Sequence, residues 1–286
     1  MISTKNALVL AGGGVAGIAW ETGFLLGLQD EAPDIAVQLL APSTTLIGTS
    51  AGSTVAAQIA TGNDLQALFD TQVGPTTAEV SATIDLAQFG AVMAEAMQGA
   101  SSPEQVRQRI GAVALQAETP PVSVRRAVIE ARLTQDEWPE WPLLITAVDT
   151  GTGEARVFDR TSRTNLVDVV SASCAVPGVW PPVKIDGRVY MDGGIRSLAN
   201  ADLAEGAERV LVLVPSAPES PLGQAVPEAQ LDALHDARVH IVFADAASLE
   251  AMGANALDPE SRVPSAKAGR EQGRRQAAGF ASFWTE

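Results

Sequence analysis

The fold of this 286-residue chain is decided by the stretch TLIGTSAG, residues 45–52. Residues 45–47 form a short apolar run typical of a buried strand, and the small and apolar residues after Gly52 continue as a helix. Residues 48–52 between them match G-x-S-x-G, which places a serine on a sharp strand-to-helix turn. A side chain at Gly48 or Gly52 would collide with the neighbouring backbone, and the turn would set the Ser50 hydroxyl at the positive end of a helix. The stretch predicts a nucleophilic Ser50; the alternative is a small-residue turn without chemistry.

A similar strand–turn–helix unit opens the chain. The apolar run Ala7–Leu10 stops at Gly12-Gly13-Gly14, and apolar residues then recur at helical spacing from Ile18 to Gln29. Two such units in succession favour an α/β fold with a largely parallel sheet.

The glycine loop Gly12–Gly17 formally fits G-x-G-x-x-G, which is a weak signal by itself. It could cradle a dinucleotide, form an oxyanion hole from backbone N–H groups, or simply allow close helix–strand packing. A dinucleotide fold needs an acidic residue about 20 positions on, at the end of a second strand. Asp34 lies at about the right number of residues after the glycine loop. However, it precedes the possible strand Ile35–Leu40 and would lie at the start of that strand and not at its end. Together with Ser50, the loop favours an oxyanion hole.

The rest of the chain alternates between helical and strand patterns. Residues 63–135 are expected to be mostly helical, 215–229 to be a surface loop, and the polar tail from Asp258 to hold a docked helix. The expected strands are Leu143–Val148, Arg156–Phe158, Val210–Val214, Val239–Ala244 and a hairpin over Val183–Met191 that turns at Asp186-Gly187. No linker divides the chain, so one domain is expected over residues 1–286. Its motif-bearing core covers about residues 5–215, and residues 230–286 dock on it.

Composition limits the partners. The formal net charge is −15 and the pI is near 4.5, so nucleic acid is excluded and strongly anionic membranes are disfavoured. Cys174 is the only cysteine, and no apolar run approaches the roughly 20 residues of a membrane span. The expectation is a cytoplasmic protein that contacts a membrane only transiently at its surface.

A serine nucleophile needs a base, and the chain has only two histidines. His240 lies within an expected strand, where a structural role is the better interpretation, and His235 lies in an expected short helix. His235 is the better candidate for the Ser–His–acid triad of an α/β-hydrolase. The other candidate is Asp192, which begins Asp192-Gly193-Gly194 directly after a strand and could accept the Ser50 proton at hydrogen-bonding distance. Read alone, D-G-G also describes an ordinary turn.

Four segments, taken in order, resemble the patatin-like phospholipase family, and most closely its bacterial members with a short N-terminus. They are Gly12–Gly17, Gly48–Gly52, Ser173–Pro182 and Asp192–Gly194, within a resemblance that covers about residues 5–215. The third lies in the small-residue stretch that runs from Ala172 into Pro177 and Trp180. The resemblance implies a three-layer α/β sandwich, with helices on both faces of a mixed, mostly parallel sheet. It also implies hydrolysis of lipid or small acyl esters without metal or cofactor.

Carried over by position, the resemblance implies that Ser50 is the nucleophile and Asp192 its base. The residues implied for the oxyanion hole are Gly12, Gly13, Gly14 and Ala51, and those for the elbow and loops are Gly17, Gly48, Gly52, Gly193 and Gly194.

The chain departs from the family pattern at Ala16. The family's glycine loop commonly carries Arg or Lys there, and that cation could orient the loop or help a phosphate bind. Its absence weakens the prediction of a phospholipid substrate. It also leaves a second alternative, a catalytically idle patatin-fold module that binds lipid or a protein partner.

Overall fold

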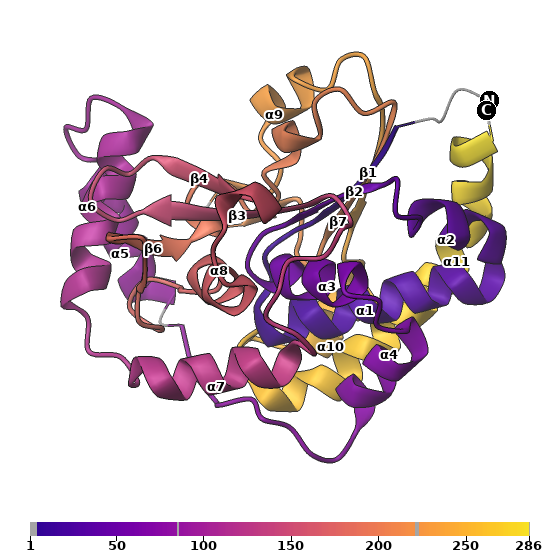
Figure 1. Ribbon diagram of the computed structural model, residues 1–286, viewed down its shortest axis with the longest axis horizontal. Coiled ribbons are helices and arrows are strands. Elements are labelled where there is room, and N and C mark those ends of the chain that lie inside the picture. The colour runs from indigo at the N-terminus through magenta and orange to yellow at the C-terminus, as the bar shows by residue number, and fades with distance from the viewer. Residues whose placement is uncertain (1–4, 85, 221–222, 286) are drawn as a thin grey trace.

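The computed structural model describes residues 5–84, 86–220 and 223–285 (Figure 1). The helices of the described residues are α1 (Gly14–Glu31), α2 (Pro33–Leu39), α3 (Ala51–Ala60), α4 (Leu65–Val73), α5 (Leu86–Met97), α6 (Pro103–Gln116), α7 (Val122–Arg132), α8 (Leu166–Ser173), α9 (Glu228–Asp232), α10 (Ala246–Met252) and α11 (Arg262–Thr285). Short 3-10 turns are η1 (Arg160–Ser162), η2 (Gly193–Ile195), η3 (Ala201–Ala204) and η4 (Pro259–Ser261).

A mixed, mostly parallel sheet forms the centre of the molecule. Hydrogen bonding links its strands in the sequence β10 (Arg238–Phe243), β7 (Arg209–Val214), β1 (Asn6–Leu10), β2 (Thr45–Gly48), β3 (Leu143–Asp149), β6 (Arg188–Asp192) and β5 (Val183–Ile185). The first five are parallel, while β6, β5 and β4 (Ala155–Phe158) pair antiparallel. A separate two-stranded ribbon joins β8 (Glu219–Ser220) to β9 (Gly223–Gln224).

The register of β3 explains how two distant loops meet. Ile145 pairs with both β2 and β4, and Ala147 pairs with both β4 and β6, so β2 and β6 must lie on the same side of β3. The two strands point towards each other, because β2 runs parallel to β3 and β6 antiparallel. Gly48 of β2 lies opposite Ile145, and Asp192 of β6 lies opposite Ala147. Their carboxyl ends therefore converge beside Thr146.

Alternation along the strands buries both faces of the sheet. Leu8, Leu10 and Leu46 face a large core with α1, α3, α8 and α11, whereas Val9 and Val212 face a smaller core with η3 and the segment around Leu234. Figure 1 shows long helices on one side of the sheet and the short α9 segment on the other. The predicted three-layer architecture is confirmed, with one layer much thinner than the other.

Helices α1 and α11 pack unusually closely. A Cβ at Gly23 would lie 2.1 Å from the Ala266 carbonyl oxygen, and one at Gly273 would lie 2.2 Å from the Phe24 carbonyl oxygen. Glycines thus let the two backbones touch, and α1 is buried between the sheet and α11. The helix that follows the glycine loop is held in place by the C-terminal helix.

The expected strands are all present, with ends shifted by at most one residue. The hairpin turn is where it was predicted, and Asp186 and Gly187 both have positive φ, 49° and 82°. The possible strand Ile35–Leu40 is wrong, because that stretch forms α2. Pro33 at the first position and Asp34 beside it are typical of a helix start, so the stretch folds as a helix and not as a strand.

Candidate active site

Ser50 and Asp192 meet although 142 residues separate them. The Ser50 hydroxyl donates a hydrogen bond of 2.8 Å to Asp192 Oδ2. Ser50 has φ 53° and ψ −115°, a strained conformation for a residue with a side chain, and α3 begins directly after it. The predicted sharp turn between strand and helix is therefore observed.

Gly48 and Gly52, on either side of Ser50, have no room for a side chain. A Cβ at Gly48 would lie 2.5 Å from the Ser53 Cα, and one at Gly52 would lie 2.0 Å from the Leu10 carbonyl oxygen. Gly17 is only slightly less confined, since its Cβ would lie 3.2 Å from that of Ala51. The turn can close over β1 only because these positions lack side chains.

Asp192 is buried, and its two oxygens have different partners. Oδ2 accepts from Ser50, and Oδ1 accepts from the Gly194 N–H at 2.7 Å. Burial raises the pKa of Asp192 to about 6, although the Gly194 N–H, the Ser50 hydroxyl and the charge of Arg125 oppose this. A carboxyl with this pKa is ionised at neutral pH and is a better base than an exposed aspartate.

Two residues at the C-terminal end of α8, Ser173 and Cys174, hold the Ser50 backbone. The Ser50 N–H donates to Ser173 Oγ at 2.9 Å, and the Cys174 thiol donates to the Ser50 carbonyl oxygen at 3.2 Å. The sequence marked this stretch only through the family resemblance. Its role here is to fix the strained turn from behind.

The glycine loop and the turn at Ser50 leave backbone amides without acceptors among the described residues. The Gly12 N–H donates to the Leu198 carbonyl oxygen at 2.9 Å, so the prediction that Gly12 serves the oxyanion hole conflicts with this bond. In the described part of the chain, the N–H groups of Gly13, Gly14 and Ala51 have no hydrogen-bond acceptor. Three unpaired donors at the start of two helices suit a developing negative charge.

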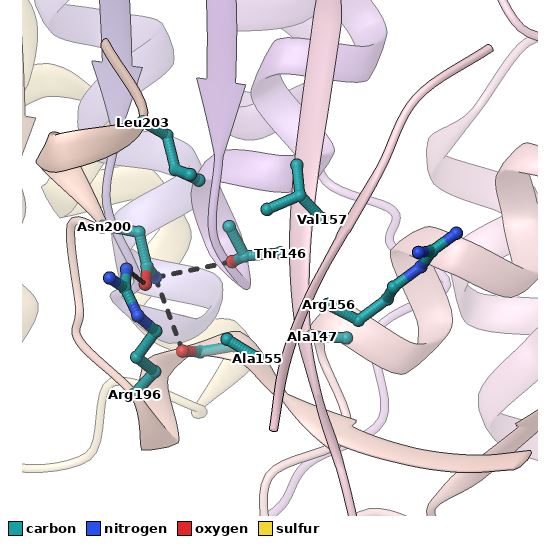
Figure 2. A pocket seen from close by; sticks show the side chains of 9 residues that line it. Thr146, Ala147, Ala155, Arg156, Val157, Arg196, Asn200 and Leu203 are labelled. Carbon is teal, nitrogen blue, oxygen red and sulfur yellow. Dashed lines mark hydrogen bonds between the residues drawn. The ribbon is translucent and has the colours of Figure 1, made fainter. Parts of the chain in front are cut away.

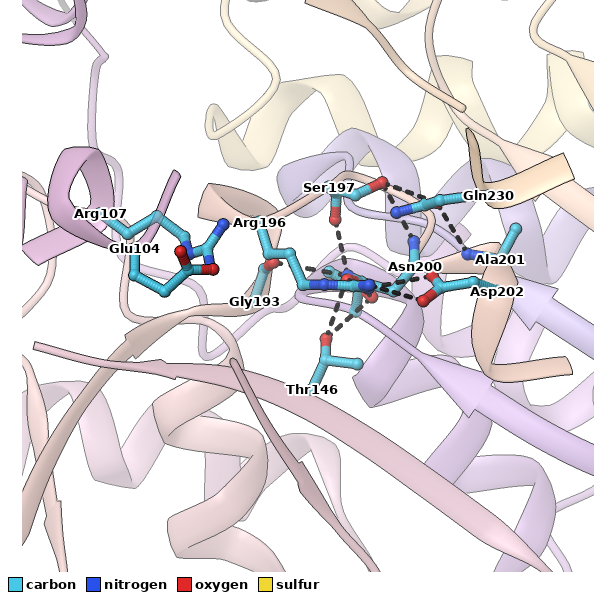
Figure 3. Close-up of polar contacts among 11 residues, drawn as sticks. Glu104, Arg107, Thr146, Gly193, Arg196, Ser197, Asn200, Ala201, Asp202 and Gln230 are labelled. Atoms are coloured by element: carbon cyan, nitrogen blue, oxygen red, sulfur yellow. Dashed lines mark hydrogen bonds and ion pairs between the residues drawn. The ribbon is translucent and has the colours of Figure 1, made fainter. Parts of the chain in front are cut away.

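Asn200 ties the two loops together. Its side-chain amide donates to the Gly193 carbonyl oxygen at 3.4 Å (Figure 3). It also donates to Thr49 Oγ1 at 3.0 Å, and the Thr49 and Thr146 hydroxyls lie 2.9 Å apart. One side chain thus reaches the residue before Ser50 and the residue after Asp192. Asn200 therefore holds the D-G-G loop against the turn at Ser50.

A cavity of about 130 Å³ lies behind the Asp192 loop, lined in part by Thr146, Asn200 and Arg196 (Figure 2). Arg196 donates to Asp202 and to Asn200, so its charge is balanced. Figure 3 shows this ion pair beside the Asn200 network. The cavity is separated from Ser50 by the residues that position it.

A second, smaller cavity lies at Ser50 itself. It measures about 20 Å³, room for about one water molecule. Its apolar walls include Val15, Ile18, Val176, Trp180 and Leu257. An acyl chain can therefore reach Ser50 only when some of these side chains move apart.

Two arginines of α7 also line this cavity, and sequence reasoning missed both. Arg132 makes two bonds of 2.7 Å to Glu79. Burial alone would raise the pKa of Glu79, but Arg132 lowers it below its ordinary value. Arg125 stacks on the Trp180 ring, with its guanidinium carbon 4.2 Å from the ring centre. No local sequence signal distinguishes these arginines from surface residues of a helix.

Neither histidine is near Ser50. The His235 side chain is exposed beyond the end of α9 and pairs with Asp236. His240 lies on β10 against Phe280 and Phe283, and burial lowers its pKa. The site therefore lacks the histidine that an α/β-hydrolase triad needs.

Asp34 lies on α2 and not at the end of a strand. The dinucleotide interpretation therefore loses the acidic residue that it required.

Comparisons with known proteins give one family match and two structural likenesses. The model of the family "Patatin-like phospholipase" matches residues 8–205, more than half of the chain. The chain is similar to the crystal structure of VipD from Legionella pneumophila at 13% identity and a TM-score of 0.48, covering 96% of this chain and 67% of that one. It is similar to the type III effector protein ExoU at 16% identity and a TM-score of 0.41, covering 99% of this chain and only 54% of that one.

No helix in the described ranges combines the length and apolar character needed to cross a bilayer. With the family model covering both loops that meet at Ser50, the chain belongs to the patatin-like phospholipase family, a family of lipid acyl hydrolases.

Proposed function

We propose that this protein hydrolyses acyl esters of lipids with a Ser50–Asp192 dyad. The observation that carries the proposal is the 2.8 Å hydrogen bond from a strained Ser50 to a buried Asp192. The N–H groups of Gly13, Gly14 and Ala51, which have no acceptor among the described residues, support it. A nucleophile, a base and an oxyanion site are the three groups that acyl transfer needs.

In the first step the Ser50 oxygen attacks the ester carbonyl carbon while Asp192 takes its proton. The carbonyl oxygen becomes an oxyanion that the N–H groups of Gly13, Gly14 and Ala51 stabilise. Asp192 then returns the proton to the leaving alcohol, which leaves the acyl group on Ser50.

In the second step water attacks the acyl-enzyme, and Asp192 takes a proton from it. The tetrahedral intermediate collapses, the proton returns to Ser50, and the fatty acid leaves. The cavity at Ser50 has room for the one water molecule that this step requires.

The test compares wild type, Ser50→Ala and Asp192→Asn on p-nitrophenyl esters and short-chain phospholipids. Both variants should lose at least about 1,000-fold in kcat, because each removes a group that acts in the chemical step. A fluorophosphonate probe should label wild type at Ser50 and leave Ser50→Ala unlabelled.

Matched controls are Asp236→Asn, an exposed carboxylate, and His235→Ala. Both should retain activity. If either histidine variant, His235→Ala or His240→Ala, abolishes turnover while Asp192→Asn retains it, the dyad is wrong. If folded wild type neither hydrolyses any ester nor labels, the idle binding module is the better description.

A further inference from the structure

The strongest unexplained group near the site is the Arg125 side chain. It is only 6% exposed, and its Nε has no hydrogen-bond partner. Within the described residues Arg125 forms neither an ion pair nor a hydrogen bond. A buried, unpaired guanidinium is costly, so its retention calls for a function.

Two carboxylates, Glu79 and Asp192, act on this charge from nearby, but neither bonds to the guanidinium. Asp192 accepts from Ser50 and from the Gly194 N–H instead. The nearby carboxylate Glu79 is already bound by Arg132 through both of its oxygens. Trp180 supplies the face of its ring, which attracts a cation but leaves the N–H donors of the guanidinium unused. Burial, and next the charge of Arg132, lower the pKa of Arg125 to about 10, so it stays protonated at neutral pH.

The position of Arg125 points to the reaction. It lines the same small cavity as Ser50, together with Gly14 of the glycine loop. Ala16, where the family's loop commonly carries a cation, is fully buried, and its N–H donates to Ala256. The loop itself therefore brings no cation to Ser50, and a cation approaches from α7 instead.

We propose that Arg125 binds the phosphate of the substrate and selects acyl esters that carry a phosphate close to the scissile ester. This inference rests on the proposed function, since it places a substrate group relative to Ser50. The planar guanidinium fits two phosphate oxygens at once, which a lysine cannot do. The charge that the family pattern places in the glycine loop is thus supplied by another element.

The experiment uses two esters with the same acyl chains, dihexanoyl phosphatidylcholine and dihexanoylglycerol, which lacks the phosphate. Arg125→Met should lower kcat/KM about 10- to 100-fold for the phospholipid and less than about 3-fold for the neutral ester. Arg125→Lys should recover part of the loss. Arg126→Met is the matched control, because Arg126 is the next residue of α7, is partly exposed, pairs with Glu130 and Asp168, and does not line the cavity at Ser50.

Assays at about pH 8.5 keep Asp192 ionised in every variant, so that a change in its titration does not imitate a binding effect. Equal losses on both esters would refute the role of Arg125 and leave the dyad intact. If no ester is hydrolysed and Ser50 does not label, the proposed function itself fails.

Wild type alone provides a second measurement, should Arg125→Met fold poorly. Glycerol phosphate should inhibit hydrolysis of dihexanoylglycerol competitively, and glycerol should not. Inorganic phosphate, as a separate arm, shows whether the anion suffices or the glycerol is needed. Absence of competition by either phosphate would overturn the inference.

Discussion

Lowering the pH titrates the base on which the proposed mechanism depends. Burial raises the pKa of Asp192 to about 6 from an ordinary 3.8. At about pH 5, a carboxyl with a pKa of about 6 is about 9% ionised, and one with an ordinary pKa is about 94% ionised. If catalysis requires ionised Asp192, kcat/KM at that pH falls to about a tenth of its plateau; with an ordinary carboxyl it would hardly change.

The assay measures initial rates on a neutral p-nitrophenyl ester from about pH 4 to about pH 9, with each sample made alkaline before its absorbance is read. Enzyme held at the lowest pH and returned to about pH 8 must recover full activity, which excludes unfolding as the cause of the loss. An acid limb near pH 4 would refute the argument that burial controls this carboxyl. Arg125→Met should move the limb to higher pH, because Arg125 opposes the rise in the pKa of Asp192.

Three further predictions concern stability and positioning. Because the folded pKa of Asp192 lies above its unfolded value, this carboxyl favours folding below about pH 4 and loses that contribution as the pH rises through about 6. Asp192→Asn should therefore raise the free energy of unfolding at about pH 8 by up to about 3 kcal/mol, and little at about pH 4, in urea titrations. Glu21 is fully buried, and burial raises its pKa well above the usual range, although the backbone of Ala11 opposes this. Glu21→Gln should flatten the decline of Tm at alkaline pH; parallel Tm curves would contradict this. A Cβ at Gly193 would lie 2.2 Å from Thr146 Oγ1, so Gly193→Ala should displace Asp192 by about 1 Å and lower kcat about 100-fold. A kcat within about 3-fold of wild type would show that the loop relaxes.

Local steric rules made the turn that carries Ser50 predictable from the sequence. The turn at Ser50 depends on glycines within a few residues of it, and the strand before and helix after are visible as apolar patterns. The partnership of Ser50 with Asp192 is different, because it depends on β2 and β6 sharing one side of β3. No pattern along the chain reports that register. Only the order of motifs in a known family suggested it.

The contacts that sequence reasoning did not predict are tertiary ones. Ser173 accepts the Ser50 N–H, and Leu198 takes the Gly12 N–H that was predicted to serve an oxyanion. In the sequence, Arg125 is not distinguishable from the other charged residues of an amphipathic helix. Only the structure shows that it is buried against Trp180. The role of a backbone N–H group or of a buried charge can be assigned only when the residues that the fold places around it are known.

The glycine contacts between α1 and α11 bear on how this protein can be cut for experiments. The family match ends at residue 205, before β7, β10 and α11. A fragment trimmed to that match would strip away the strand beside β1 and uncover the whole outer side of α1, including Trp20 and Phe24. Such a fragment is expected to aggregate, so the shortest useful expression product must extend through the last turn of α11.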